Sequence, residues 1–209
     1  MSFDVDRFLD DGYLVFDKYY TIMPSLLEDV KRVCTDSSYK NGKRFLTHIL
    51  EEVPQDLKLL IFNKEIQQFF SLLEKDIPCK DVMITHDFLN KFEINQYLHF
   101  DRWRSLKAMV YLTDVDEGDG PFSVVPGSHK KGAELRRGYR NLPYSIRPNR
   151  VELDFPENYE KPVSIHGSAG TLILFDSDIF HCGGDTLQGR ERKLIRSHWY
   201  YSRRWQEEV

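Results

Sequence analysis

The hydrophobic pattern of the first residues predicts a short helix. Phe8 and Leu9 lie in a segment that Ser2 or Asp4 can cap at its N-terminus. Asp11-Gly12 follows, and glycine is the residue that most readily ends a helix. We therefore expect a helix that ends at this pair.

A short strand and two longer helices follow in the predicted order. Residues 13–16 form an apolar run with strand character. A helix is expected after Pro24, which suits a first helical turn, with apolar positions at Leu26, Leu27, Val30 and Val33. A further helix over about residues 64–74 would bury Ile66, Phe69, Phe70 and Leu73.

After Cys79 the pattern changes to short apolar runs separated by turns. The runs cover residues 82–84, 108–112, 122–125, 171–175 and 194–200. Turn sequences rich in Gly, Pro and Asp separate them at 116–121, 126–128 and 182–185. Helices first and strands afterwards predict an α+β fold, mainly β, with a two-sheet jelly-roll barrel. The mouth between two such sheets is a common place for a small-molecule site.

Length and composition fit one domain over residues 1–209, with a helix-rich part to about residue 78 and a jelly-roll core over about 79–205. No apolar run reaches about eighteen residues, so no membrane span is expected. The acidic start lacks the pattern of a secretory signal. Three scattered cysteines predict reduced thiols and a cytoplasmic protein. A net charge of −4 argues against general nucleic-acid binding, and we expect a monomer or a weak homodimer.

Charge is unevenly distributed along the chain. Residues 130–150 contain seven Lys or Arg residues and one Glu, which makes this segment +6 and the remainder −10. Such a segment is either a solvated loop or a lid over the mouth that steers an anion. Together with Arg102 and Arg104, it favours an anionic substrate.

Two histidines and one aspartate are the candidate metal ligands. His99 and Asp101 are two positions apart, so on a β-strand their side chains would leave the same face. His181 lies 82 residues after His99, beside another apolar run. Two histidines and one carboxylate on one side of an ion leave the opposite positions open, which is the arrangement of non-haem Fe(II) oxygenases.

Each of these signals is weak alone, because a His-x-Asp pair arises often by chance and a buried histidine is more often a core residue. Asp176 and Asp178 are rival carboxylates, although neither stands in a His-x-Asp pair. The remaining histidines with a structural interpretation are His86, His129, His166 and His198.

Three longer segments resemble the phytanoyl-CoA dioxygenase family. They are His99–Asp101 with the strand and turn at residues 108–116, the run 120–130 (Gly-Pro-Phe-Ser-Val-Val-Pro-Gly-Ser-His-Lys), and residues 169–176 with His181 and Arg192. The opening residues 8–15 are also similar, so the resemblance touches both ends of the chain. The segment 120–129 is its most specific part.

The resemblance implies a cupin-like double-stranded β-helix, with the N-terminal helices packed on one sheet. It also implies Fe(II), 2-oxoglutarate as a consumed cosubstrate, and O₂. His99, Asp101 and His181 fall on the metal-ligand positions, and Arg192 falls on the arginine that binds the distal carboxylate of 2-oxoglutarate. A guanidinium matches a carboxylate with two parallel hydrogen bonds.

Further cosubstrate contacts are expected from Asn90, Lys91, Tyr111 and Thr171. Gly183 departs from relatives that have a serine at this position, which touches the same carboxylate. The remaining contact to that carboxylate is therefore left open.

The function expected from sequence is a 2-oxoglutarate-dependent dioxygenase, a hydroxylase of a small, preferably anionic, metabolite that releases succinate and CO₂. Two alternatives stay open. One is a jelly-roll binding or regulatory protein without turnover, and the other is an iron oxygenase that does not use 2-oxoglutarate.

Overall fold

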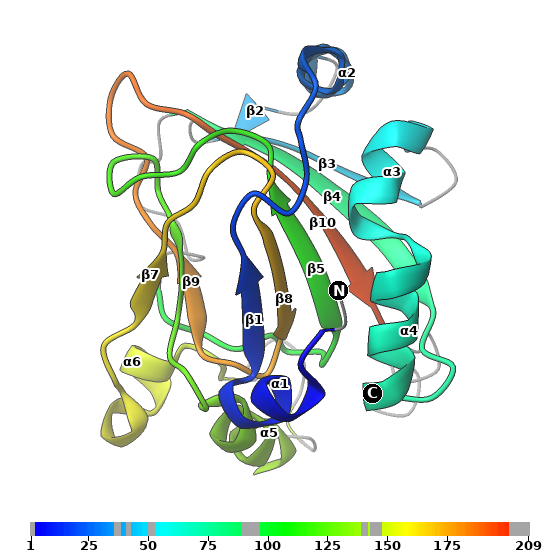
Figure 1. Ribbon diagram of the computed structural model, residues 1–209. Helices are drawn as coiled ribbons and strands as arrows, with labels where there is room; N and C mark the ends of the chain where they lie inside the picture. The colour runs from blue at the N-terminus through cyan, green and yellow to red at the C-terminus, as the bar shows by residue number, and fades with distance from the viewer. Residues whose placement is uncertain are drawn as a thin grey trace.

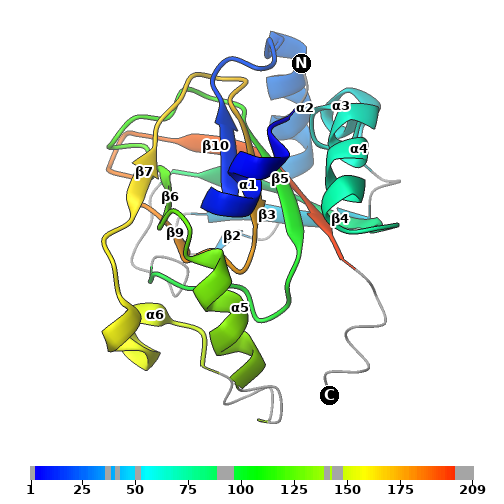
Figure 2. The ribbon, with the colours of Figure 1, turned by 60° about the horizontal axis from the view of Figure 1, so that its bottom comes forward.

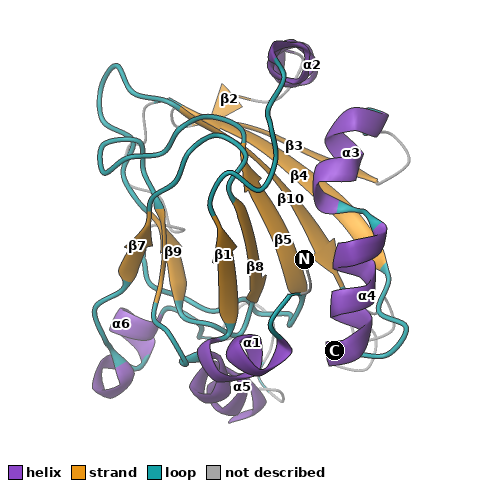
Figure 3. Cartoon of the chain, viewed as in Figure 1, coloured by secondary structure: helices purple, strands orange, loops and turns teal. Residues whose placement is uncertain are grey.

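The computed structural model describes residues 3–35, 39–40, 43–49, 53–88, 97–138, 142 and 148–200. Two antiparallel sheets face each other (Figures 1 and 3). In order across the larger sheet, the strands are β1 (Tyr13–Phe16), β8 (Leu172–Asp176), β5 (Leu106–Tyr111), β10 (Arg192–Trp199), β4 (Cys79–Asp87), β3 (Lys43–Ile49) and β2 (Tyr39–Lys40). The smaller sheet has the order β7 (Val163–Ile165), β6 (Phe122–Val124) and β9 (His181–Gly183). The predicted α+β fold with a jelly-roll core is confirmed.

Helices cover the outer face of the larger sheet. They are α1 (Val5–Asp11), α2 (Pro24–Thr35), α3 (Gln55–Ile61) and α4 (Lys64–Leu73). Asp4 caps α1 by accepting a hydrogen bond from the Arg7 amide, and Gly12 ends the helix with φ +81°. Ile66, Phe69 and Phe70 are buried against the sheet. Figure 1 shows α3 and α4 against β10 and β4.

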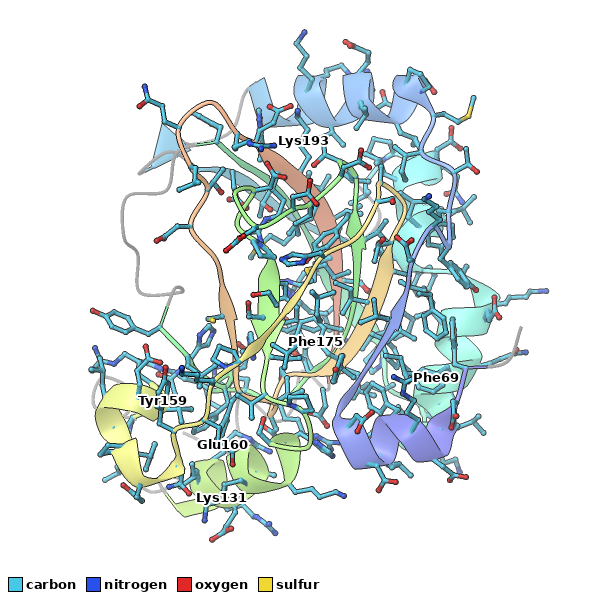
Figure 4. The ribbon with its side chains drawn as sticks, turned by 60° about the vertical axis from the view of Figure 1, so that its left-hand side comes forward. Phe69, Lys131, Tyr159, Glu160, Phe175 and Lys193 are labelled. Atoms are coloured by element: carbon cyan, nitrogen blue, oxygen red, sulfur yellow. The ribbon has the colours of Figure 1, made fainter. Side chains whose placement is uncertain are left out.

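Strand parity separates the two faces of β10. Ile195 and Trp199 belong to the core beneath the helices. Leu194 has the opposite parity and packs in the interior between the sheets, with Met109 and Phe175. In Figure 4, Phe175 lies in this interior, whereas Phe69 lies in the helix layer. The side chains between the sheets are the ones that can form a site.

A second group of helices lies at one end of the barrel. It consists of α5 (His129–Gly138), α6 (Val151–Asp154) and the 3₁₀ helix η4 (Pro156–Asn158). Figure 2 brings α1 and α5 forward at this end, and in Figure 4 Lys131 and Tyr159 lie there. The basic segment 130–150 therefore begins as a helix. This finding corrects the loop interpretation for its first residues, whereas the lid interpretation stays a prediction.

Several elements were not expected from the sequence. β2 and β3 belong to the larger sheet although they lie in the helix-rich part, and α3 precedes α4. The three-residue strands β7 and β9 are too short to show a hydrophobic period. The single-domain assignment and its boundary near residue 78 stay predictions. Among the described helices, none combines the length and apolarity that crossing a membrane requires.

Candidate metal centre

The three predicted ligands lie together. One side-chain atom from each of His99, Asp101 and His181 lies within 4.8 Å of the others, and His181 Nε2 is 3.7 Å from Asp101 Oδ1. The two imidazole rings have centroids 4.4 Å apart. His181 is buried, and the other two residues are half-buried.

Backbone pairing brings the two histidines together across 82 residues of sequence. The His99 amide donates to the His181 carbonyl at 2.9 Å, and the His181 amide donates to the His99 carbonyl at 2.7 Å. The amide of Asp101 donates to the carbonyl of Ser177 at 2.9 Å. His99 thus lies in an isolated β-bridge and Asp101 lies outside any strand. The prediction that His99 and Asp101 lie on one strand is wrong, because the β-ladder hydrogen bonds at His99 do not continue to Asp101.

Both histidines are oriented by the carbonyl two residues before them. Nδ1 of His99 lies 2.8 Å from the Tyr97 carbonyl, and Nδ1 of His181 lies 2.8 Å from the Ile179 carbonyl. A carbonyl only accepts, so each Nδ1 carries the proton and each Nε2 keeps its lone pair. Burial lowers the pKa of both histidines, which favours the neutral form that binds metals.

Asp101 is ionised and has one oxygen occupied. The ammonium of Lys107 donates a hydrogen bond to its Oδ2. Burial alone would raise the pKa of Asp101, but Lys107 and the two histidines hold it well below its usual range. Burial lowers the pKa of Lys107 to about 8, and Asp101 opposes that shift. Oδ1 therefore remains as the oxygen that faces His181.

These groups fit one metal ion. Two imidazole lone pairs and one carboxylate oxygen are the donor set of a site with three protein ligands on one side. Chain order gives no such grouping, so the arrangement is a product of the fold.

Arg192 lies at the start of β10 and points into the barrel. Its Nε and Nη2 donate to Oδ2 of Asp87, at 3.1 and 2.8 Å, and Nη1 donates to the Gly120 carbonyl. A Cβ built on Gly183 would lie 3.7 Å from Arg192 Nη2. The guanidinium therefore reaches β9, the strand that begins with His181, and position 183 leaves room beside it.

The other predicted cosubstrate residues are arranged differently. The hydroxyl of Tyr111 donates to the Ile165 carbonyl at 2.9 Å and accepts from the Phe122 amide at 3.0 Å, which joins the two sheets. The hydroxyl of Thr171 bonds to Asp17 at 2.9 Å and Ser168 at 2.8 Å. Asn90 and Lys91 lie outside the described residues.

The rival carboxylates are bound by arginines. Arg104 donates to Asp176 at 2.8 Å and to Glu74 at 2.9 Å. Arg136 on α5 makes two hydrogen bonds to Asp178, at 2.8 and 2.9 Å. Arg104 and Arg136 are thus neutralised within the protein. They give no support to the anionic substrate that the sequence favoured.

Three histidines outside the triad make hydrogen bonds that have a structural role. His129 bonds to the Leu9 carbonyl at 3.2 Å, His86 to Glu191 at 2.8 Å, and His198 to Asp81. The turn before His129 supports the metal ligands indirectly. The Ser128 hydroxyl accepts a hydrogen bond from the Phe180 amide at 2.8 Å, next to His181.

Sequence reasoning missed Lys107. It lies six residues after Asp101 at the edge of an apolar run, and its side chain is only 6% exposed. Its parity with Met109 and Tyr111, both interior residues, is the signal that could have placed it between the sheets.

Fold and site together define a jelly-roll protein with a one-sided His/Asp/His metal centre. Residues 94–193 match the family described as Phytanoyl-CoA dioxygenase (PhyH). The match covers slightly less than half of the chain, and the resemblance predicted from sequence is confirmed there.

Two curated relatives match a shorter part of the chain. The ectoine dioxygenases of Bordetella parapertussis and Bordetella bronchiseptica are each 31% identical over 87 residues, which is 37% of this chain. The matched part spans 28% of the relatives' length.

Solved structures share the fold over nearly the whole chain. The epimerase SnoN, in complex with Fe³⁺, alpha ketoglutarate and nogalamycin RO, has a TM-score of 0.69 at 16% identity, covering 94% of this chain and 81% of its own. HygX from Streptomyces hygroscopicus, with nickel and 2-oxoglutarate bound, has a TM-score of 0.62 at 15% identity, covering 93% and 85%. EctD from S. alaskensis, with 2-oxoglutarate and 5-hydroxyectoine, has a TM-score of 0.62 at 15% identity, covering 94% and 74%.

Proposed function

We propose that this chain is an Fe(II)- and 2-oxoglutarate-dependent dioxygenase that hydroxylates a small metabolite. One observation carries the proposal. The Nε2 atoms of His99 and His181 and Oδ1 of Asp101 converge, while hydrogen bonds elsewhere hold the other polar atoms of the same side chains. The similarity to the dioxygenase family supports the same conclusion.

The overall reaction balances as follows. Substrate C–H, 2-oxoglutarate and O₂ yield the hydroxylated substrate, succinate and CO₂. When bound, the iron together with 2-oxoglutarate would supply the oxidant derived from O₂.

The protein contributes orientation and exclusion of water. Met109, Phe175 and Leu194 belong to an apolar cluster between the sheets, and Phe175 packs beside His181, which limits the access of water to that ligand. Hydrogen bonds to Tyr97 and Ile179 hold the rings in place. Arg192 would bind the distal carboxylate of 2-oxoglutarate with the N–H groups that Asp87 and Gly120 leave available.

Two features favour an iron oxygenase without 2-oxoglutarate as the second candidate. Arg192 is already neutralised by Asp87, and Gly183 has no hydroxyl that could bind the distal carboxylate of 2-oxoglutarate. Succinate release that depends on both substrate and 2-oxoglutarate would exclude this candidate. The same measurement separates the enzyme from a binding protein that has no turnover.

The first experiment is an anaerobic titration of the protein with Fe(II) and 2-oxoglutarate, followed by the visible charge-transfer band of the complex. The wild type is expected to develop the band, and His99→Ala and Asp101→Ala are expected to lose it. His166→Ala is the matched control, because His166 is exposed. A wild type without the band, or a band that survives in both triad variants, would contradict the proposal. A small-molecule substrate and a cytoplasmic location are part of the proposal.

A further inference from the structure

Arg196 is a half-buried cation in the barrel interior, and it forms no ion pair with a carboxylate among the described residues. On β10 it has the same parity as Arg192 and Leu194, and its register partners are Met83 on β4 and Met109 on β5. Its Nη2 lies 3.3 Å from the sulfur of Met83. Its Nε is buried and, among the described residues, has no hydrogen-bond partner.

Three cations that are buried among the described residues each have a carboxylate. Arg192 binds Asp87, Lys107 binds Asp101, and Arg136 binds Asp178. A buried charge that lacks such a partner is costly, so it is found where something else compensates it. Burial lowers the pKa of Arg196, although the charges of Asp101, Asp81 and Asp87 oppose the shift.

Thr85 provides a second unpartnered group on the same face. Its side chain is 3% exposed, and its hydroxyl has no hydrogen-bond partner among the described residues. Thr85 pairs with Leu194 on β10, so it is a diagonal neighbour of Arg196 across the two strands. A guanidinium and a hydroxyl on adjacent strands form a donor set for the oxygens of an acid group.

The position of this pair relates it to the metal centre. Arg196 pairs with Met109 on β5 and is a diagonal neighbour of Lys107, which binds Asp101, so Arg196 lies on the ligand side of the barrel interior. Arg192 lies four residues earlier. Its charge opposes the rise that burial causes in the pKa of Tyr111, and its guanidinium lies beside Gly183 on the opposite sheet. The two arginines therefore serve different parts of the interior, and a cosubstrate held by Arg192 leaves Arg196 available.

We propose that Arg196 and Thr85 bind the acid group of the substrate, which makes the substrate a small organic acid. This inference rests on the proposed function, since it assigns the substrate class of the same site. It replaces the basic segment 130–150 as the reason to expect an anion. The acid group would anchor one end of the substrate while the C–H to be oxidised faces the metal centre.

The test uses inorganic sulfate as the probe. Sulfate is titrated calorimetrically, at constant ionic strength, into the anaerobic protein loaded with Fe(II) and 2-oxoglutarate. Sulfate binding is expected to weaken at least about tenfold in Arg196→Met and about threefold in Thr85→Val. Arg190→Met is the matched control, because Arg190 is 57% exposed at the rim, and it should bind sulfate as the wild type does.

Unchanged sulfate affinity in both Arg196→Met and Thr85→Val would overturn the inference. So would an Arg196→Met variant that loses affinity for 2-oxoglutarate alone, because Arg196 would then be the cosubstrate arginine. Methionine matches the two flanking methionines, so Arg196→Met is expected to unfold at the wild-type temperature or above it. If the wild type shows no charge-transfer band, the proposed function fails, and sulfate titration of the metal-free protein still tests the anion site.

Discussion

Lys107 donates a hydrogen bond to one oxygen of Asp101 and leaves the other oxygen facing His181 at 3.7 Å. This contact decides which carboxylate oxygen is available to a metal. It also keeps the carboxylate charged in a site where burial favours the neutral acid. Lys107 is therefore expected to act through Asp101 as a positioning residue.

Lys107→Met tests this relationship. Loss of the ammonium frees Oδ2 to rotate and raises the pKa of Asp101, so Fe(II) affinity at pH 7 should fall about 10- to 100-fold. Anaerobic titration with Fe(II) measures the change. Because protonation competes with the metal, the loss should be larger at pH 6 than at pH 8. Lys193→Met is the control, since Lys193 binds Glu191 at the surface. Equal affinity in Lys107→Met and wild type would contradict the assignment.

Arg192→Met should raise the 2-oxoglutarate concentration needed for half of the charge-transfer band, by about tenfold or more. The Fe(II) affinity should stay near that of the wild type, because Arg192 contacts none of the triad side chains through a described hydrogen bond. The variant also leaves Asp87 buried without its arginine, so its unfolding temperature must be measured alongside. A variant that folds and binds 2-oxoglutarate normally would favour the oxygenase that does not use it.

Arg136→Met should destabilise the protein by up to about 3–5 kcal/mol, since the buried Asp178 would keep only the more distant Arg104 guanidinium, at 3.7 Å. Chemical denaturation gives the free energy of unfolding. The double variant Arg136→Met with Asp178→Leu should recover a large part of the loss. If the single variant matches the wild type, the pair contributes little to stability.

The free energy of unfolding should fall as the pH decreases from about 6.5 to about 4. Burial, with Lys107 and Arg196 nearby, lowers the pKa of His198 to about 4 despite its bond to Asp81. Between these two values the unfolded chain binds a proton that the folded chain does not, so acid favours unfolding. For this group the loss is up to about 3 kcal/mol. His198→Gln should show a shallower decrease over the same range, and an identical slope would exclude His198 as a cause.

Much of the site could be predicted from local sequence. The His-x-Asp pair, His181 and the surrounding turns follow a family pattern, and the fold brings the three side chains together. The apolar run at 108–112 predicts a strand. It does not predict the inward-facing Lys107, because a lysine beside an apolar run is expected to mark the end of the strand. Only pairing of β5 with β10 and β8 defines what faces Lys107.

Other parts depend on contacts distant in sequence. β3 has the sequence Lys-Arg-Phe-Leu-Thr-His-Ile, in which apolar and polar residues do not alternate, so its place beside β4 comes from pairing. The first turns of the basic segment form α5, which is held in place by the hydrogen bond from Arg136 to Asp178, 42 residues later. No local pattern contains that partner.

Gly132 lets the backbone of α5 pack directly against the loop that precedes the metal ligand His181. A Cβ at this position would lie 1.9 Å from the carbonyl oxygen of Asp178, three residues before His181. The helix backbone therefore touches the very loop that presents the distal histidine. Any side chain at position 132 would displace this loop. The expected result is a shifted His181 imidazole and not only a less stable surface helix.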